Sequence, residues 1–545
     1  MSREPIDLLI VGGGVTGAGI ARDAALRGFR TALVDKGDFA GGTSSRSSRL
    51  VHGGLRYLEQ YDFGLVFEAS RERRILLRIA PHLVRPLPFL FPTYRGGRVS
   101  PWRLRAGMWL YDALASFRNV HRHRWLSPRE VRRAEPGLRD RELRGAALYY
   151  DAQTDDGRLT LATMRDAARA GAHIANYAQV TSFLKADGRV GGAAVRDLLS
   201  GAVHQVRALT VVNATGPWTD MVRRMDDPAA AALLRPTKGT HVVVPRARLG
   251  HSYAITVLSP LDGRVMFILP WGDLSYIGTT DTDEPQTPDD VRASGADVVY
   301  LLRSANAMYP QARLVPKDVV ATWSGLRPLL APDKTLMASQ VSREHRVSES
   351  PSGLITIAGG KLTTYRVMAR DVVDRVATRL RGLDGRPLAP QPATDRMPLP
   401  GGESADLEVL VEAARSREMP EPTARHLVAK YGSESAAVLN LVDRDRAVGR
   451  PIVESRPEIW AEVEYAMERE MALRLPDVMI RRLHLFYEAP GQGLALAKAV
   501  AERMTARLGW DAGRREAEVA DYRREVDRSR QFLKEISRAS HAVTA

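Results

Sequence analysis

Three glycines near the start of the chain have the spacing of a phosphate-binding turn. Gly12, Gly14 and Gly17 form a G-x-G-x-x-G motif, which lets a pyrophosphate approach the backbone and lets a helix pack closely on a strand. The following helix would offer free N–H groups and a partial positive charge to the phosphates. Asp35 lies 18 residues after Gly17, where a carboxylate can accept hydrogen bonds from ribose hydroxyls. These residues predict a site for an adenine dinucleotide. The alternative is a turn packed for structure only.

The residues around these glycines predict the elements that must hold them. Residues 6–11 and 32–34 are apolar runs that flank a helical pattern rich in small residues, as in a strand–turn–helix–strand unit. Residues 209–214 form another strand, which runs into the turn Thr215-Gly216-Pro217-Trp218. Residues 354–358 form a third, followed by Gly359-Gly360-Lys361 and a helix from about Thr363. Because parallel strands end at one edge of a sheet, we expect the three junctions to meet there.

The rest of the chain predicts an insertion and a separate helical part. Residues 241–280 contain several short alternating strands, which indicate an inserted antiparallel sheet that would roof the site. Residues 64–80 have helical periodicity, residues 387–402 are a linker rich in Pro and Gly, and residues 403–537 have an almost wholly helical pattern. We therefore predict an α/β fold with three domains. The first is a discontinuous Rossmann-type dinucleotide-binding domain formed by residues 1–94, 145–230 and 325–386. It carries a substrate or cap domain formed by residues 95–144 and 231–324, and a C-terminal helical domain follows at residues 403–545.

Composition limits the classes of protein to which the chain can belong. At 545 residues, two or three domains are expected. The absence of cysteine excludes disulfides, thiolate metal sites, iron–sulfur clusters and cysteinyl-linked cofactors, and we expect no metal. No apolar h-region or run of 18 apolar residues is present, so neither a signal peptide nor a membrane-spanning helix is expected. The net charge of +15 favours anionic partners, but no nucleic-acid-binding module is recognisable.

A second motif, residues 41–59, reads GGTSSRSSRLVHGGLRYLE. The hydroxyl-rich residues 43–48 follow the ribose-binding strand and can hydrogen-bond a cofactor's phosphates and ring edge, unless they form a solvated loop. His52-Gly53-Gly54 allows close backbone approach to a planar ring. Arg56 and Tyr57 follow at once, which brings a cation and a phenol to the same place.

Together with GGGVTGAGIARDAALRG, the segment TSSRSSRLVHGGLRYLE resembles FAD-dependent glycerol-3-phosphate dehydrogenase, the membrane-associated type within the D-amino-acid-oxidase-like flavoprotein superfamily. NATGPW, KGTHVVVP, FILPWGD, IGTTDT, SGLRPL and GGKLTTYR match the same family in order. The similarity is dense over residues 5–375 and looser in the C-terminal part. It implies a Rossmann-type FAD-binding domain with non-covalent FAD.

The resemblance also implies a reaction. The family oxidises sn-glycerol 3-phosphate to dihydroxyacetone phosphate by hydride transfer from C2 to N5 of FAD. Electrons then pass to ubiquinone or menaquinone. The implied location is cytoplasmic, attached peripherally to the inner face of the cell membrane.

Such a reaction needs cations for a phosphate dianion and a base for the C2 hydroxyl. Arginine offers a planar fork to phosphate oxygens and lysine a point charge. His241 is the first candidate for the base and His52 the second, although a lone histidine is more often a structural hydrogen-bonding residue. The predicted catalytic residues are therefore His241, His52 and Arg327, and the predicted substrate-binding residues are Arg56, Tyr57, Lys238, Arg327 and Lys361.

The predicted cofactor contacts come from the three junctions and the hydroxyl-rich segment. The helix predicted from about Thr363 would point its N-terminus at the pyrimidine end of the flavin and stabilise the negative charge of the reduced ring. The full set is Gly12, Gly14, Gly17, Asp35, Thr43, Ser44, Ser45, Ser48, Leu50, Gly53, Gly54, Ala214, Gly216, Gly360, Lys361, Leu362, Thr363 and Thr364.

Residues 95–125 interleave aromatic and basic side chains, which suits an anionic bilayer surface. An ordinary packing helix with a solvated basic edge is the alternative. Three other functions stay open: a glycerol-3-phosphate oxidase using O₂, an amine or amino-acid oxidase on the same fold, and a basic FAD-containing binding protein without turnover. Assembly as a homodimer is also open.

Overall fold

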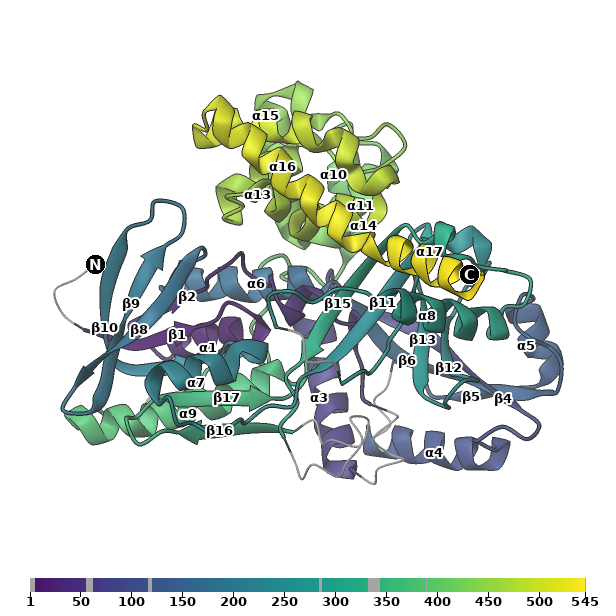
Figure 1. The fold of residues 1–545 in the computed structure, drawn as a ribbon, viewed down its shortest axis with the longest axis horizontal. Helices are drawn as coiled ribbons and strands as arrows, with labels where there is room; N and C mark the ends of the chain where they lie inside the picture. The colour runs from purple at the N-terminus through teal and green to yellow at the C-terminus, as the bar shows by residue number, and fades with distance from the viewer. Residues whose placement is uncertain are drawn as a thin grey trace.

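Two β-sheets lie beside one another, and the C-terminal helices stack across them (Figure 1). The computed structural model describes residues 5–54, 62–115, 120–283, 287–331, 344–388 and 390–544. Among these residues, no helix combines the length and the apolar character needed to cross a membrane.

The first sheet carries the three predicted junctions. Its strand order is β16–β17–β10–β1–β2–β7, and all neighbouring pairs are parallel except β16–β17. The bounds are β1 Ile6–Val11, β2 Thr31–Val34, β7 His173–Ala175, β10 Val203–Asn213, β16 His345–Glu349 and β17 Ile355–Gly359. Since β1, β10 and β17 are adjacent and parallel, their carboxyl ends meet at one edge, as predicted.

Both faces of this sheet are covered. Leu8, Ile10 and Leu33 pack with helices α1 (Val15–Leu26), α6 (Asp156–Arg169) and α9 (Tyr365–Asp384). The alternate residues, such as Leu9 and Val11, pack against β8 (Ala178–Ala186) and β9 (Arg189–Asp197). Burial on both faces explains why these strands are continuous apolar runs in the sequence.

Gly17 is where α1 and β1 come closest. A Cβ at this position would overlap the carbonyl oxygen of Gly12. We therefore expect Gly17→Ala to push α1 from the sheet, to cost about 1–3 kcal/mol of folding free energy and to weaken FAD binding. Thermal unfolding with and without FAD measures both effects. Gly64→Ala is the control, because a Cβ there meets nothing within 4 Å. Equal melting temperatures for the two variants would contradict this account of the turn.

The second sheet has the order β15–β11–β14–β13–β12–β4–β6–β3, with β5 paired to β6. Apart from the parallel pair β12–β4, the neighbouring strands are antiparallel. The bounds are β3 Leu50–Val51, β4 Val84–Tyr94, β5 Arg124–Leu126, β6 Leu143–Thr154, β11 Thr237–Pro245, β12 Ala254–Leu258, β13 Val265–Trp271, β14 Leu274–Gly278 and β15 Ala321–Arg327. Four of them correspond to the alternating strands predicted between residues 241 and 280.

The membership of this sheet differs from the predicted domain boundaries. β4 and most of β6 fall in ranges that we assigned to the FAD-binding domain, and the boundary at residue 325 cuts β15. The physical reason is that β4 and β6 pair with each other along their length and join the second sheet through β12. A local hydrophobic pattern identifies a strand but not the sheet to which it adds.

Helices α3 (Phe63–Ile79) and α4 (Pro101–Leu114) flank the second sheet, and α8 (Gly295–Met308) covers its other face. The predicted helix over residues 64–80 corresponds to α3. Shorter elements complete this half: α5 Pro128–Ala134 and α7 Thr219–Asp226, with the 3₁₀ turns η1 Thr43–Ser45, η2 Gly216–Trp218, η3 Arg246–Arg248 and η4 Pro316–Asp318.

The C-terminal part is helical, as predicted, and it is joined to the first sheet by buried charges. Asp38, which follows β2, accepts hydrogen bonds from Nη1 and Nη2 of Arg482 at 2.6 and 2.8 Å and is also paired with Arg481. Burial alone raises the pKa of Asp38, but these two guanidiniums hold it at about 2. The helices are α10 Leu407–Arg415, α11 Glu421–Tyr431, α12 Ser435–Arg444, α13 Trp460–Arg469, α14 Leu485–Glu488, α15 Ala497–Leu508, α16 Ala512–Ser529 and α17 Gln531–Thr544, with a π-helical turn at Asp477–Arg482.

The fold class is therefore confirmed: a Rossmann-type α/β domain carries an antiparallel cap sheet and a C-terminal helical domain. Helix α17 extends from the C-terminal helices to the cap sheet, where it lies beside α8 (Figure 1). The arrangement leaves the carboxyl edge of β1, β10 and β17 facing the cap sheet.

Candidate active site

A cavity of about 740 Å³ lies at the carboxyl edge of the parallel sheet. This is a usual size for a cofactor or ligand site. The predicted cofactor-contact residues in its wall are Gly12, Gly14, Asp35, Thr43, Ser44, Ser45, Ala214, Gly216, Gly360, Lys361 and Leu362. The predicted residues that do not line it are Gly17, Ser48, Leu50, Gly53, Gly54, Thr363 and Thr364.

The turn after β1 is tight and lies at the N-terminus of α1. Gly12 has φ +115°, and a Cβ there would lie 2.6 Å from the carbonyl oxygen of Ala214, so only glycine fits. The amide of Val15, in the first turn of α1, donates to the hydroxyl of Ser44 at 2.9 Å. The hydroxyl-rich segment therefore closes over the N-terminus of α1, where phosphate oxygens bind favourably.

The side chain of Asp35 is held by two backbone amides. Its two carboxylate oxygens accept the amides of Gly13 at 2.6 Å and Gly37 at 2.7 Å. Burial raises the pKa of Asp35 to about 6, although both amides lower it. The glycines, the α1 terminus and this carboxylate fit the pyrophosphate and ribose of FAD.

The pKa of Asp35 predicts a pH dependence of cofactor binding. Ribose hydroxyls donate to the ionised carboxylate, so FAD binding favours the deprotonated form. The affinity of the apoprotein for FAD should then fall as pH drops through about 6, by up to about tenfold per unit. Fluorescence quenching titrations of flavin between pH 4.5 and 8 measure this slope. In Asp35→Asn the affinity should be lower and nearly independent of pH. Parallel slopes in the two proteins would contradict the assignment.

The segment His52–Gly54 is fixed between two elements. The amide of Gly53 donates to Oδ1 of Asp151 at 3.0 Å, and the hydroxyl of Tyr111 on α4 donates to the same oxygen at 2.8 Å. The amide of His52 donates to the hydroxyl of Thr363 at 3.3 Å, beside the start of α9. The backbone predicted to approach the flavin ring is thus tied to α4 on one side and to α9 on the other.

His241 lies in the middle of β11 and faces the junction of the two sheets. Its ring stacks on Trp323 of β15 with centroids 4.9 Å apart, and its Nε2 is 2.9 Å from the hydroxyl of Ser48. Nδ1 has no hydrogen-bond partner among the described residues. Burial, followed by the nearby charges of Arg327 and Arg49, lowers the pKa of His241 to about 3. The imidazole is therefore neutral at physiological pH.

Arg327, at the end of β15, is 17% exposed and rigidly oriented. Its guanidinium donates to Asp281 at 3.1 Å and to the hydroxyl of Thr279 at 2.9 Å. A Cβ at Gly239 would contact this guanidinium, so the glycine of KGTH makes room for it. Gly239 and His241 lie on the same face of β11 because successive side chains alternate. The structure thus brings Arg327 and His241 to one face.

Lys238 lies on the opposite face of β11. It is fully buried, and its ammonium is 2.9 Å from Asp297 of α8. Because Lys238 forms a buried ion pair on the face away from Arg327 and His241, we do not include it in the substrate site proposed below. Lys361 lines the cavity. Arg56 and Tyr57 lie outside the described residues.

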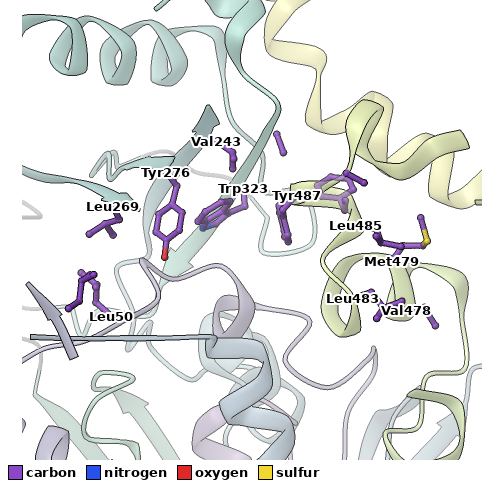
Figure 2. Packing of buried hydrophobic residues seen from close by; sticks show 14 of the residues in the cluster. Leu50, Val243, Leu269, Tyr276, Trp323, Val478, Met479, Leu483, Leu485 and Tyr487 are labelled. Atoms are coloured by element: carbon purple, nitrogen blue, oxygen red, sulfur yellow. The ribbon is translucent and has the colours of Figure 1, made fainter. Parts of the chain in front are cut away.

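Several residues of the site are not among those predicted. Asp281 and Thr279 orient Arg327, and Trp323 supports His241. The sequence IGTTDT, which contains Thr279 and Asp281, is equally typical of a structural turn. An isolated tryptophan in a strand indicates only a core position. Figure 2 shows Trp323 between Tyr276 and Tyr487, three rings from the cap sheet and the helical domain.

Comparisons with known proteins agree with this geometry. Residues 7–374 match the family of FAD-dependent oxidoreductases, and residues 392–515 match the C-terminal domain of α-glycerophosphate oxidase. The chain is 40% identical to glycerol-3-phosphate dehydrogenase 2 of Mycobacterium tuberculosis, over 97% of this chain and 89% of that protein. It is 36% identical to the aerobic glycerol-3-phosphate dehydrogenase of Bacillus subtilis, over 94% of this chain and 93% of that one.

A solved structure is similar over nearly the whole length. The glycerol-3-phosphate dehydrogenase of Bacillus halodurans, crystallised with FAD, superposes with a TM-score of 0.81 at 32% identity and covers 98% of this chain and 97% of its own. The L-α-glycerophosphate oxidase of Mycoplasma pneumoniae, at 17% identity and a TM-score of 0.56, shares the fold. This chain belongs to the glycerol-3-phosphate dehydrogenase family of FAD-dependent oxidoreductases, and its cofactor is FAD.

Proposed function

We propose that this protein oxidises sn-glycerol 3-phosphate to dihydroxyacetone phosphate and passes the electrons to a membrane quinone. The observation that carries the proposal is that Arg327 and His241 lie on one face of the cap sheet, beside the cofactor cavity. A fixed guanidinium and a neutral imidazole are the groups that a phosphate ester with an oxidisable hydroxyl requires. The names of the relatives support the same substrate.

Each residue has a separate role in this mechanism. Arg327 and Lys361 bind the phosphate, and Asp281 and Thr279 keep the guanidinium in one orientation. With Nε2 of His241 donating to Ser48, the lone pair on Nδ1 accepts the proton of the C2 hydroxyl. His52 is the second candidate for this base. When bound, FAD supplies the acceptor for the C2 hydride. Arg56 and Tyr57 remain proposed substrate contacts from the sequence alone.

Turnover assays test the substrate. Dihydroxyacetone phosphate should form from sn-glycerol 3-phosphate when a short-chain quinone is present, and not from glycerol. Glycine and sarcosine should not be oxidised, which separates this function from an amine oxidase. Faster reoxidation of the reduced protein by air than by quinone would instead indicate an oxidase. Product from glycine but not from the phosphate ester would overturn the proposal.

We further propose that α4 and the adjoining α3 contact the anionic inner face of the cell membrane. Trp102 and Trp109 on α4 are 69% and 59% exposed, and Phe67 on α3 is 50% exposed. The guanidinium of Arg103 lies over the ring of Trp102. In Figure 1 these helices lie on the opposite side from the C-terminal helices. Aromatic rings beside arginines suit the interface of an anionic bilayer.

Vesicle flotation tests this surface. The protein should float with vesicles containing phosphatidylglycerol more than with pure phosphatidylcholine, and Trp102→Ala combined with Trp109→Ala should abolish flotation. Leu261→Ala removes another exposed apolar side chain from the cap, one that is 54% exposed, and should have no effect. Flotation that is unchanged in the double variant would exclude α4 as the contact.

A further inference from the structure

Arg49 is a buried cation that the mechanism above does not use. It lies between Ser48 and β3, is almost fully buried and has φ +53°. Few residues other than glycine adopt positive φ, and strained positions cluster at functional sites. Its amide donates to the hydroxyl of Ser47 at 3.0 Å, and its carbonyl accepts from the amide of Thr154 at 2.9 Å. The backbone is therefore held in this conformation from both sides.

The guanidinium of Arg49 lies in an aromatic cage. It is 4.6 Å from the ring centroid of Trp271, 5.1 Å from Trp323, 5.3 Å from Tyr487 and 5.8 Å from Tyr276. Figure 2 shows Tyr276, Trp323 and Tyr487 in a row above Leu50, the residue that follows Arg49. The rings come from β13, β14, β15 and α14, so one cation joins the cofactor segment, the cap sheet and the helical domain.

The charge of Arg49 has a carboxylate nearby but, within the described part of the chain, no close ion pair. Among the described residues its ion-pair partner is Asp156, at 3.9 Å from Nε, and Nε itself makes no hydrogen bond. Asp156 also accepts the amide of Ser47 at 2.9 Å. Burial alone lowers the pKa of Arg49, but the carboxylate of Asp156 and the surrounding groups raise it above its ordinary value, and cation–π contacts stabilise the guanidinium further. The group therefore carries a permanent positive charge.

The positive charge of Arg49 acts on the imidazole of His241. Ser48, the neighbour of Arg49, bonds Nε2 of His241, and Trp323, under the guanidinium, stacks on its ring. Among the residues that the structure describes, Arg327 of β15 acts on the imidazole more strongly than Arg49, and both positive charges lower the pKa of His241. The hydroxyls of Tyr276 and Tyr487 stay protonated because burial raises the pKa of both.

We propose that Arg49 is a positioning residue: the aromatic cage fixes it so that Ser48 stays against His241 and a permanent positive charge disfavours the imidazolium. The inference rests on the proposed function, in which neutral His241 accepts the substrate proton. It also concerns the protonation of His241 itself, which can be measured without any turnover.

The test removes the charge and follows the protonation of His241. Histidine ¹³Cε1 NMR of labelled full-length protein from as low a pH as the fold tolerates up to pH 8, with His241→Asn to assign the signal, reports imidazole protonation. Loss of a nearby charge in Arg49→Met should raise the midpoint by about one pH unit, so that the ratio of protonated to neutral His241 at pH 4 rises about tenfold. Arg49→Lys keeps the charge and should restore the wild-type curve. If Arg49→Met does not retain FAD, Arg49→Gln takes its place.

Arg139→Met is the matched control. The guanidinium of Arg139 also covers an aromatic ring, that of Tyr94 at 4.0 Å, and its buried Nε likewise makes no hydrogen bond among the described residues. This variant should change stability and leave the His241 titration unmoved. A titration in Arg49→Met and Arg49→Gln that overlays the wild type would overturn the proposal.

Discussion

Replacing His241 by asparagine will slow reduction of the flavin by sn-glycerol 3-phosphate by about 10²–10⁴-fold, the usual contribution of a positioned base. The KM for the substrate should change little, because the phosphate contacts remain. In the wild type, the pKa of about 3 keeps His241 neutral, so its protonation should cause no loss of rate between pH 5 and 8. Anaerobic stopped-flow measurement of flavin absorbance gives both quantities.

His251→Asn is the control for this variant. His251 is buried in the same cap, where its ring bonds the hydroxyl of Ser275 at 2.5 Å and the carbonyl of Tyr253 at 2.8 Å. Burial lowers its pKa to about 4, so the two histidines share a similar environment but only one faces the cofactor side. Equal losses of rate in both variants would mean that buried imidazoles support the sheet and that neither is the base. In that case His52 becomes the candidate to test.

Replacing Arg327 by leucine will raise the KM for sn-glycerol 3-phosphate by about 10²–10³-fold, because two or more charge-assisted hydrogen bonds to the phosphate are lost. Bound FAD should remain at the wild-type ratio, since the residue does not line the cofactor cavity. Asp281→Asn, which removes the carboxylate that orients the guanidinium, should give a smaller rise. Steady-state kinetics and the flavin-to-protein absorbance ratio measure these effects.

Arg248→Leu is the matched substitution elsewhere in the cap. Its guanidinium is held by Asp318 and by the carbonyl of Ala312 at 2.8 Å, so it is ordered as Arg327 is. This variant should keep the wild-type KM. If Arg327→Leu also keeps it, the phosphate is bound elsewhere, and Arg56 and Lys361 become the cations to replace.

The cofactor half of the site could be predicted from the sequence because its chemistry is local. Gly12 and Gly14 act through their backbone and Asp35 through its carboxylate, all within one strand–turn–helix–strand unit, and they all line the cavity. The junctions at Ala214 and Gly360 could be placed because parallel strands end at one edge.

The substrate half depends on pairing between distant strands, which a local pattern does not encode. Lys238 and Gly239 are neighbours in the sequence, yet alternation along β11 sends one to Asp297 and opens the other to Arg327. The contact of His241 with Ser48 spans 193 residues. The same limit explains why the domain ranges drawn from the sequence do not follow the sheets at β4 and β6.

Anaerobic addition of sn-glycerol 3-phosphate to the purified FAD-bound protein is the measurement that tests the central claim most directly. We expect rapid bleaching of the flavin band near about 450 nm with this substrate and no bleaching with glycerol, glycine or sarcosine. A flavin band that is present but unchanged by sn-glycerol 3-phosphate would contradict the proposed function and leave only the family and its cofactor standing.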